Sequence, residues 1–354
     1  MGIKSIKYIL VYLTPAVVIF SLWAGGYWSY TALIILFGLM PLLELLTTGS
    51  TSNLSAIEED IVQKDIIYDL LLYGLMPVQY FTMIYFFYQV SDDSVPMFAK
   101  IGMNIAFGLS CGILGINAAH ELGHRNTWYE QMMSKMLLLT TLYMHFFIEH
   151  NRGHHKNVST DEDPASSRYG ETVYAFYFRT IKDSWFSAWH LEKDRLQKTG
   201  KHFWSFHNEM LRFQILQLTL VGLVYFIFGW QTLLFYLLSA GTGCLLLETV
   251  NYIEHYGLRR KKIGNRYERT LPIHSWNSNH PLGRLLLLEL SRHSDHHFLA
   301  NRKYQILRHF DESPQMPKGY PGMMILSLIP PLWFKVMHRQ IDTYKATQMG
   351  EALA

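Results

Sequence analysis

The sequence contains little cysteine and little charge. Cys111 and Cys244 are its only cysteines and no C-x-x-C pair occurs, which excludes an iron–sulfur centre within these 354 residues. Both lie in apolar stretches, where we expect them to pack as small buried residues. Charged residues make up 17% of the chain, the net charge is +3, and no nucleic-acid-binding motif accompanies it. Internal repeats, low-complexity segments and long linkers are also absent, so the sequence predicts one domain over residues 1–354.

Long apolar runs dominate what is present. A transmembrane helix needs about 20 mostly apolar residues. Only Gly229-Trp230-Gln231 separates the last two runs, which predicts a tight turn there. The pattern predicts an all-α, multi-pass membrane protein with about six transmembrane helices. These lie near residues 6–24, 28–47, 68–90, 97–119, 211–229 and 231–250.

Basic residues predict the orientation, because cytoplasmic loops of membrane proteins are enriched in Lys and Arg. Lys4 and Lys7 precede the first apolar run, and the short loop 91–94 is acidic. Most other basic residues lie in 120–210 and 251–354. Six crossings place these two polar regions on the cytoplasmic side, as a histidine-rich catalytic cap.

Nine histidines in four clusters carry the strongest functional signal. Imidazole ligates iron, copper, zinc and nickel, and residues at i, i+3 and i+4 of a helix share one face. The clusters HELGH, EHNRGHH and RHSDHH keep that spacing, and NYIEH adds a single histidine. One metal rarely takes more than four protein nitrogens, so nine candidates predict two metals. The candidate ligands are His120, His124, His150, His154, His155, His255, His293, His296 and His297.

The EHNRGHH cluster is the most specific of the four. On an α-helix His150 and His154 share a face, while His155 points about 100° away. There it could bind a second metal ion or complete the site of the first. The apolar segment 131–148 lies between this cluster and HELGH. If it crossed the membrane, the two clusters would lie on opposite faces. We therefore interpret it as a buried helix, or a hairpin that dips into the membrane and returns.

Further polar residues are expected around the ligands. Asp295 is placed to hold the distal ring nitrogen of a ligand, a common arrangement at metal sites. The spacing of six between His274 and His280 suits no single helix face, which favours hydrogen bonding over ligation. The full set expected around the metals is Glu121, Glu254, His274, His280 and Asp295.

Charged residues outside the clusters have simpler interpretations. The segment 156–168 (KNVSTDEDPASSR) is interpreted as a solvated loop, since it contains Pro164 and many small polar residues. Arg152, Arg168 and the run Arg259–Lys262 are candidates for docking a small acidic electron carrier.

The histidine clusters resemble those of the membrane di-iron desaturases, hydroxylases and hydrocarbon monooxygenases. Within that superfamily, HELGHR, EHNRGHHKNVSTDEDPASSRYGE, NYIEHYGL, HSWNSNH and LSRHSDHH are similar to integral-membrane alkane 1-monooxygenases, over roughly residues 110–340. The resemblance implies two non-haem irons held by the nine histidines, O2 as co-substrate and a place in the bacterial inner membrane. It also implies electrons from rubredoxin and its reductase, supplied as separate proteins because this chain contains no rubredoxin domain.

Four alternatives remain at this stage. Xylene-type methyl hydroxylases share the histidine clusters, and fatty-acyl desaturases or hydroxylases share their spacing. HELGH also matches the H-E-x-x-H of zinc metalloproteases, with Glu121 as general base. A hydrolytic zinc needs three protein ligands and an open position, which nine histidines exceed. A metal transporter would place its histidines along the spans instead of at one membrane face.

Overall fold

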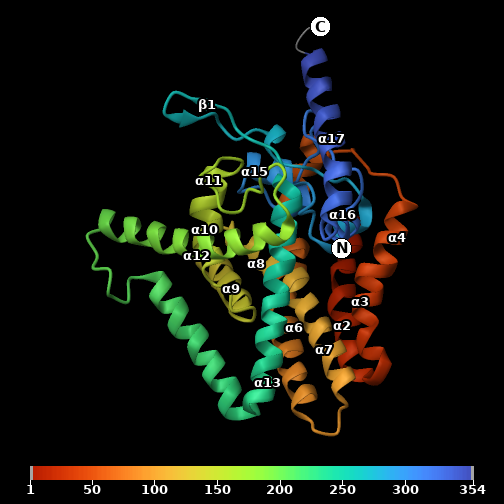
Figure 1. Ribbon diagram of the computed structural model, residues 1–354, viewed down its shortest axis with the longest axis vertical. Helices are drawn as coiled ribbons and strands as arrows, with labels where there is room; N and C mark the ends of the chain where they lie inside the picture. The colour runs from red at the N-terminus through yellow and green to blue at the C-terminus, as the bar shows by residue number, and fades with distance from the viewer. Residues whose placement is uncertain (1–2, 352–354) are drawn as a thin grey trace.

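The computed structural model describes residues 3–351, and they are almost entirely helical. The one sheet in this range is an antiparallel hairpin of β1 (Lys262–Ile263) and β2 (Arg266–Tyr267). A bundle of long helices forms one end of the molecule, and shorter helices and loops form a cap at the other (Figure 1). The predicted all-α class is confirmed.

Five helices of the described chain are long and apolar enough to cross a membrane. Each is built from one or more of the elements η1 (Lys7–Tyr12), α2 (Leu13–Ala24), η2 (Gly26–Tyr30), α3 (Thr31–Leu33), η3 (Ile34–Leu39), α4 (Met40–Leu45), α6 (Ile66–Ser91), α7 (Met97–Ser110), η4 (Cys111–Ile116), α8 (Asn117–Gly123) and α13 (Glu209–His255). The candidate spans are Lys7–Ala24, Gly26–Leu45, Ile66–Ser91, Met97–Gly123 and Glu209–His255.

The difference between five spans and about six arises at Gly229. The predicted segments 211–229 and 231–250 both lie in α13, which is interrupted only by the non-helical backbone of Gly229, with φ 82° and ψ 174°. Glycine adopts this conformation without the clash that a Cβ would cause. The chain therefore reverses direction there, and α13 forms two arms joined at the far end of the bundle (Figure 1).

The segment 131–148 is a hairpin and not a continuous helix. Helix α9 (Trp128–Leu139) ends in a turn in which Leu142 has φ 53°, and α10 (Phe146–Glu149) follows. A hairpin is one of the two arrangements that the sequence left open. It brings the HELGH and EHNRGHH clusters to the same end of the bundle.

The close contact between α13 and the helix carrying HELGH depends on glycines. A Cβ on Gly112 of η4 would lie 2.9 Å from the Leu246 Cβ, and one on Gly243 would lie 2.6 Å from the Cys111 Cβ. Such distances are too short for real side chains, so only glycine permits this approach of the two backbones. Cys111 is buried in this contact and Cys244 is half-buried, and neither forms a disulfide.

The cap surrounds the bundle end at which the histidines lie. Several of its elements start at side-chain caps, for example Thr172, whose hydroxyl accepts from the Ala175 N–H at the start of α12. Residue Ser55 forms a capping box with Glu58 in the same way. The remaining elements are α1 (Ile3–Ile6), α5 (Ala56–Lys64), η5 (His150–His154), α11 (His155–Asn157), α12 (Val173–Lys198), η6 (Pro272–His274), α14 (Pro281–Leu286), α15 (His293–Phe298), η7 (Tyr304–Ile306), α16 (Tyr320–Ser327) and α17 (Pro330–Glu351).

Candidate metal centre

All nine candidate histidines come together in two adjoining groups. In each group one ring nitrogen per histidine lies within 4.8 Å of the others. The rings of His155 and His297, one from each group, have centroids 4.5 Å apart. The first group contains His120, His124, His150, His155 and His296, and the second contains His154, His255, His293 and His297.

Four elements distribute these histidines. Helix α8 carries His120, and its C-cap His124, to the first group, and the end of α13 carries His255 to the second. The cap segments η5–α11 and α15 each supply both groups. In α15 the i,i+4 pair His293 and His297 serves the second group while His296 serves the first, a division that the shared helix face did not predict.

The EHNRGHH segment departs from the predicted pairing. Residues 150–154 form a π-helix, and the His155 N–H donates to the His150 carbonyl in an i→i+5 pattern. This wider turn places His155, and not His154, beside His150. His154 therefore belongs to the second group, and the α-helical assumption behind the predicted 150/154 pair was wrong.

The distances between ring nitrogens fit a metal with ligands at right angles. In the first group the His150 Nε2 lies 3.0 Å from the Nε2 of His124 and 3.0 Å from that of His155. The Nε2 atoms of His155 and His296 are 3.1 Å apart. In the second group the Nε2–Nε2 distances run from 2.9 to 3.2 Å. Two nitrogens about 2.1 Å from one ion lie about 3.0 Å apart at 90°, but about 3.4 Å apart in a tetrahedron. These neighbouring nitrogens are therefore closer together than in a regular tetrahedral zinc site.

The environment keeps most of these imidazoles neutral. Burial, followed by the neighbouring histidines, lowers the pKa of His150, His155 and His296 well below the usual value, and that of His124 falls to about 3. Metal ligation requires the neutral ring, whose lone pair is free. The apo-site therefore needs no deprotonation at neutral pH to accept a metal at these positions.

His154 is the exception, and Asp163 is the reason. Burial disfavours its charged form, but Asp163, with Glu149 and Glu248, outweighs burial and raises the pKa of His154. The Asp163 Oδ2 lies 2.9 Å from the His154 Nδ1 and also accepts from the Ser166 hydroxyl, and its Oδ1 accepts from the Ala165 N–H. Asp163 is 2% exposed, so the segment 156–168 is not simply a solvated loop.

The sequence placed this carboxylate role at Asp295. The structure instead pairs Asp295 with Arg302, at 2.8 and 2.7 Å, and with the Arg308 N–H at 2.7 Å. Asp295 therefore fixes the loop after α15 and contacts no ligand ring.

Of the other expected residues, Glu254 is the one that reaches the ligands. Its Oε2 lies 3.1 Å from the His293 Nε2, and its Oε1 accepts from the Tyr320 hydroxyl at 2.7 Å. Glu121 instead forms an ion pair with Arg125 at 2.7 Å and accepts from the Tyr304 N–H. A carboxylate held in this way is poorly placed to act as a proteolytic base.

His274 and His280, which belong to neither histidine group, have local partners. The His274 ring lies 3.2 Å from Glu268 and accepts from the Leu271 N–H, so it points away from the nine ligands. Only the backbone of His274 reaches the site, through a hydrogen bond to the ring of His255. His280 contacts the Ser278 hydroxyl at 3.2 Å.

An apolar cavity of about 50 Å³ reaches both histidine groups. His120 and His150 of the first group and His293 of the second form its polar end. Glu254 and Asn251 also line it. The rest of the wall is largely apolar and comes mainly from η4 and α13, with Gly112, Ile113, Ile116, Phe146, Leu246, Leu247, Val250, Leu287, Leu290 and Met324.

Comparison with known proteins agrees with this site. The fatty acid desaturase family model matches residues 97–327. The alkane 1-monooxygenase of Acinetobacter baylyi is 41% identical over 314 residues, which cover 88% of this chain and 77% of that protein. The alkane 1-monooxygenase 1 of Alcanivorax borkumensis is 39% identical over 338 residues, 94% of this chain and 83% of that protein. The chain belongs to the alkane 1-monooxygenase family.

Membership of this family confirms the resemblance drawn from the histidine motifs. The chain is therefore an enzyme, and its apolar helices and its relatives identify an integral membrane protein. A more distant relative, the hydroxylase component of the xylene/toluene monooxygenase of Pseudomonas putida, is 26% identical over 338 residues, 94% of this chain and 88% of that protein.

The basic residues suggested for docking have mostly structural roles. Arg152 pairs with Glu192 and Glu209. Arg259 and Arg260 donate to backbone carbonyls on neighbouring loops. In the run Arg259–Lys262 only Lys261 and Lys262 are fully exposed, at the hairpin that projects from the cap (Figure 1). Arg168 is also exposed.

Proposed function

We propose that this enzyme hydroxylates the terminal methyl group of linear alkanes at a centre of two non-haem irons, each held by one histidine group. The overall reaction is R–CH3 + O2 + two electrons + two protons giving R–CH2OH and water. The observation that carries the proposal is the apolar cavity that ends at His120, His150 and His293. It would bring a hydrocarbon, which has no polar handle, to ring nitrogens of both groups.

The residues fit the proposed metal and substrate. A saturated C–H bond offers no charge for acid–base groups to act on, and bound iron would supply the redox chemistry with O2 that zinc lacks. The histidines would hold the irons, and Asp163 would orient the His154 ring through its Nδ1. The three histidines at the end of the cavity and Glu254 are buried, which would exclude water from its reacting end.

The apolar wall would select the substrate by shape. Burial of each CH2 yields about 0.8 kcal/mol relative to water, but a chain that enters from lipid has already gained most of this. Discrimination would therefore depend on how the side chains of η4 and α13 accommodate the chain. The cavity of about 50 Å³ is narrow, so these side chains must separate to admit a long alkane.

We further propose rubredoxin, reduced by its reductase, as the electron donor, and the bacterial inner membrane as the location. The absence of any C-x-x-C from the sequence supports an external carrier. Lys261, Lys262 and Arg168 offer exposed positive charge on the cap for an acidic partner.

Product analysis with 18O2 tests the reaction class. Purified enzyme with rubredoxin and reductase is offered octane, hexadecane, xylene and a fatty-acyl thioester, and products are identified by mass spectrometry. We expect primary alcohols carrying one 18O from the alkanes. A double bond without inserted oxygen would indicate a desaturase, and benzylic alcohol from xylene alone would indicate a methyl hydroxylase.

Metal analysis of the same preparation is an independent test. Two irons per chain are expected. About one zinc and no iron in active protein would overturn the proposal in favour of a hydrolytic enzyme.

A further inference from the structure

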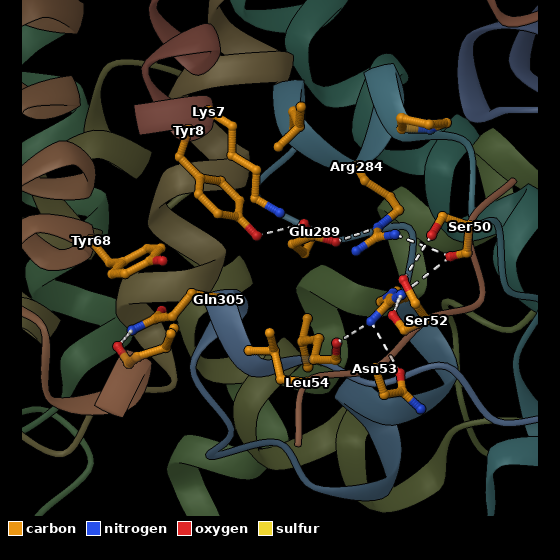
Figure 2. Close-up of a pocket in the computed structure, with 15 residues that line it drawn as sticks. Lys7, Tyr8, Ser50, Ser52, Asn53, Leu54, Tyr68, Arg284, Glu289 and Gln305 are labelled. Carbon is orange, nitrogen blue, oxygen red and sulfur yellow. Dashed lines mark hydrogen bonds and ion pairs between the residues drawn. The ribbon is translucent and has the colours of Figure 1, made fainter. Parts of the chain in front are cut away.

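A second cavity lies where the first apolar helix begins, and no step of the proposed reaction uses it. Its volume is about 290 Å³, and none of the nine histidines lines it. Figure 2 shows that side chains from segments far apart in the sequence point into it. They are Lys7, Tyr8, Ser50, Ser52, Asn53, Leu54, Val62, Tyr68, Pro281, Arg284, Leu285, Glu289, Arg292, Gln305 and Leu307.

One carboxylate lines the cavity, and each of its oxygens already accepts a hydrogen bond. Glu289 accepts from the Tyr8 hydroxyl at 2.6 Å and from the Arg284 Nε at 2.5 Å (Figure 2). Arg284 thus neutralises Glu289, and the pair carries no net charge. The remaining charged residues of the wall, Lys7 and Arg292, are both positive.

Arg292 is a buried cation that has no carboxylate within hydrogen-bond distance. It is 3% exposed, and its guanidinium donates only to neutral oxygens: the carbonyls of Leu307, Ser50 and Ser52 and the side chain of Asn53. Its Nε–H has no partner among the described residues. Burying a cation without a counter-charge is costly, and the Nε–H leaves one donor for an anionic oxygen such as that of a phosphate.

The position of the cavity suggests the source of the anion. Lys7 is exposed at its mouth, with Nζ 4.9 Å from the centre of the Tyr8 ring, and is the first residue of the candidate span Lys7–Ala24. A basic residue at the end of a membrane helix lies at the level of lipid headgroups. Leu54 and Val62 give the cavity an apolar side that a lipid glycerol and its first methylenes could contact.

We propose that this cavity binds a phosphate group, and that the source is the headgroup of an anionic membrane phospholipid. The phosphate oxygens would accept from Arg292 and Lys7 above the neutral Glu289–Arg284 pair. Arg292 directly precedes His293, so a bound lipid would also hold the loop that leads into α15 and its three histidines.

Lipid binding to the full-length protein tests this without any turnover assay, so its failure is distinguishable from failure of the proposed function. Delipidated enzyme in detergent is titrated with phosphatidylglycerol or phosphatidylcholine, and bound lipid is counted by native mass spectrometry. Phosphatidylglycerol should bind preferentially, and inorganic phosphate should displace it. Arg292→Gln and Lys7→Gln should each weaken binding about fivefold, the usual effect of one basic residue near a membrane surface.

Lys182→Gln is the matched control, because Lys182 is an exposed lysine on α12, far from the cavity in sequence, whose ion pair is with the adjacent Asp183. It should bind lipid as the wild type does. If Arg292→Gln does not fold, Lys7→Gln carries the test alone. If inorganic phosphate binds and either variant weakens it, but neither lipid is preferred, the site is retained and its ligand is free phosphate. Equal binding of the two lipids with no effect of phosphate, or unchanged affinity in folded variants, would overturn the proposal.

Discussion

Replacing Asp163 with asparagine isolates the role of a carboxylate that contacts one histidine of one group. Asparagine keeps the size of the side chain, and its one oxygen can still accept from the Ala165 N–H, while an amide NH2 replaces the oxygen that accepts from Ser166. The negative charge 2.9 Å from the His154 Nδ1 is lost. That charge makes the imidazole a stronger base and fixes which ring nitrogen faces the second group.

The expected magnitude follows from this geometry. Loss of a carboxylate that orients a ligating histidine typically costs 10- to 100-fold in metal affinity, or about 1.4 to 2.7 kcal/mol. His154 belongs only to the second group, so one of the two proposed irons should be weakened and the other retained. Turnover should fall with the loss of that iron.

Chelator titration of purified protein, with iron counted by elemental analysis, measures this directly. Wild type should release its irons at similar chelator concentrations, whereas Asp163→Asn should release one iron at 10- to 100-fold lower concentration. Asp161→Asn makes the same charge change two residues away, on a side chain that is 78% exposed and lies 3.6 Å from Arg259. Identical release curves for both variants and the wild type would refute the assignment of Asp163 to the second group.

Four further outcomes are expected. His293→Ala should abolish hydroxylation while the protein remains in the membrane, since the apolar helices and not this ligand hold the fold; full iron content with substantial turnover would contradict ligation. Val250→Phe adds bulk to the cavity wall and should lower kcat/KM for hexadecane relative to octane by about fivefold or more, measured by product chromatography. NADH alone should support no turnover, and addition of rubredoxin with its reductase should restore it. Activity at limiting rubredoxin should fall as salt is added, because the Debye length shrinks from about 10 Å at 0.1 M to about 3 Å at 1 M. The double variant Lys261→Glu, Lys262→Glu should need more rubredoxin for the same rate. The metal-free protein should lose thermal stability as pH falls below about 6.5, because the histidines whose pKa is lowered by burial take up protons only on unfolding; a midpoint that rises with acid would contradict this.

The membrane helices and the nine histidines could be predicted because residue type alone carries those signals. A run of about 20 apolar residues can satisfy its backbone in lipid only as a helix, whatever its neighbours. Even the reversal at Gly229 was visible, as a glycine between two such runs. The requirement that two histidine clusters meet predicted that 131–148 does not cross the membrane, but it left a buried helix and a hairpin equally open.

Features that depend on tertiary contacts were not predictable. Asp163 lies in a polar run that reads as a loop, and its burial results from packing between η5–α11 and the segment that follows α13, where Ser159 donates to the His274 carbonyl. The burial of Arg292 among backbone carbonyls requires segments around Ser50 and Leu307, more than 250 residues apart, to meet. No local pattern encodes either contact.

The division of the histidines follows from where the backbone departs from α-helical geometry. With an α-helix at 150–155, His150 and His154 would face one metal and His155 would have been the outlier. The π-turn instead gives neighbouring residues, His154 and His155, to different groups. Because η5–α11 and α15 each contribute to both groups, these cap segments set the spacing between the two proposed metals. Helices α8 and α13 contribute to one group each, so the bundle sets the depth of each metal relative to the membrane. Changes in the bundle should therefore alter substrate access, whereas changes in the cap should alter the relation between the metals.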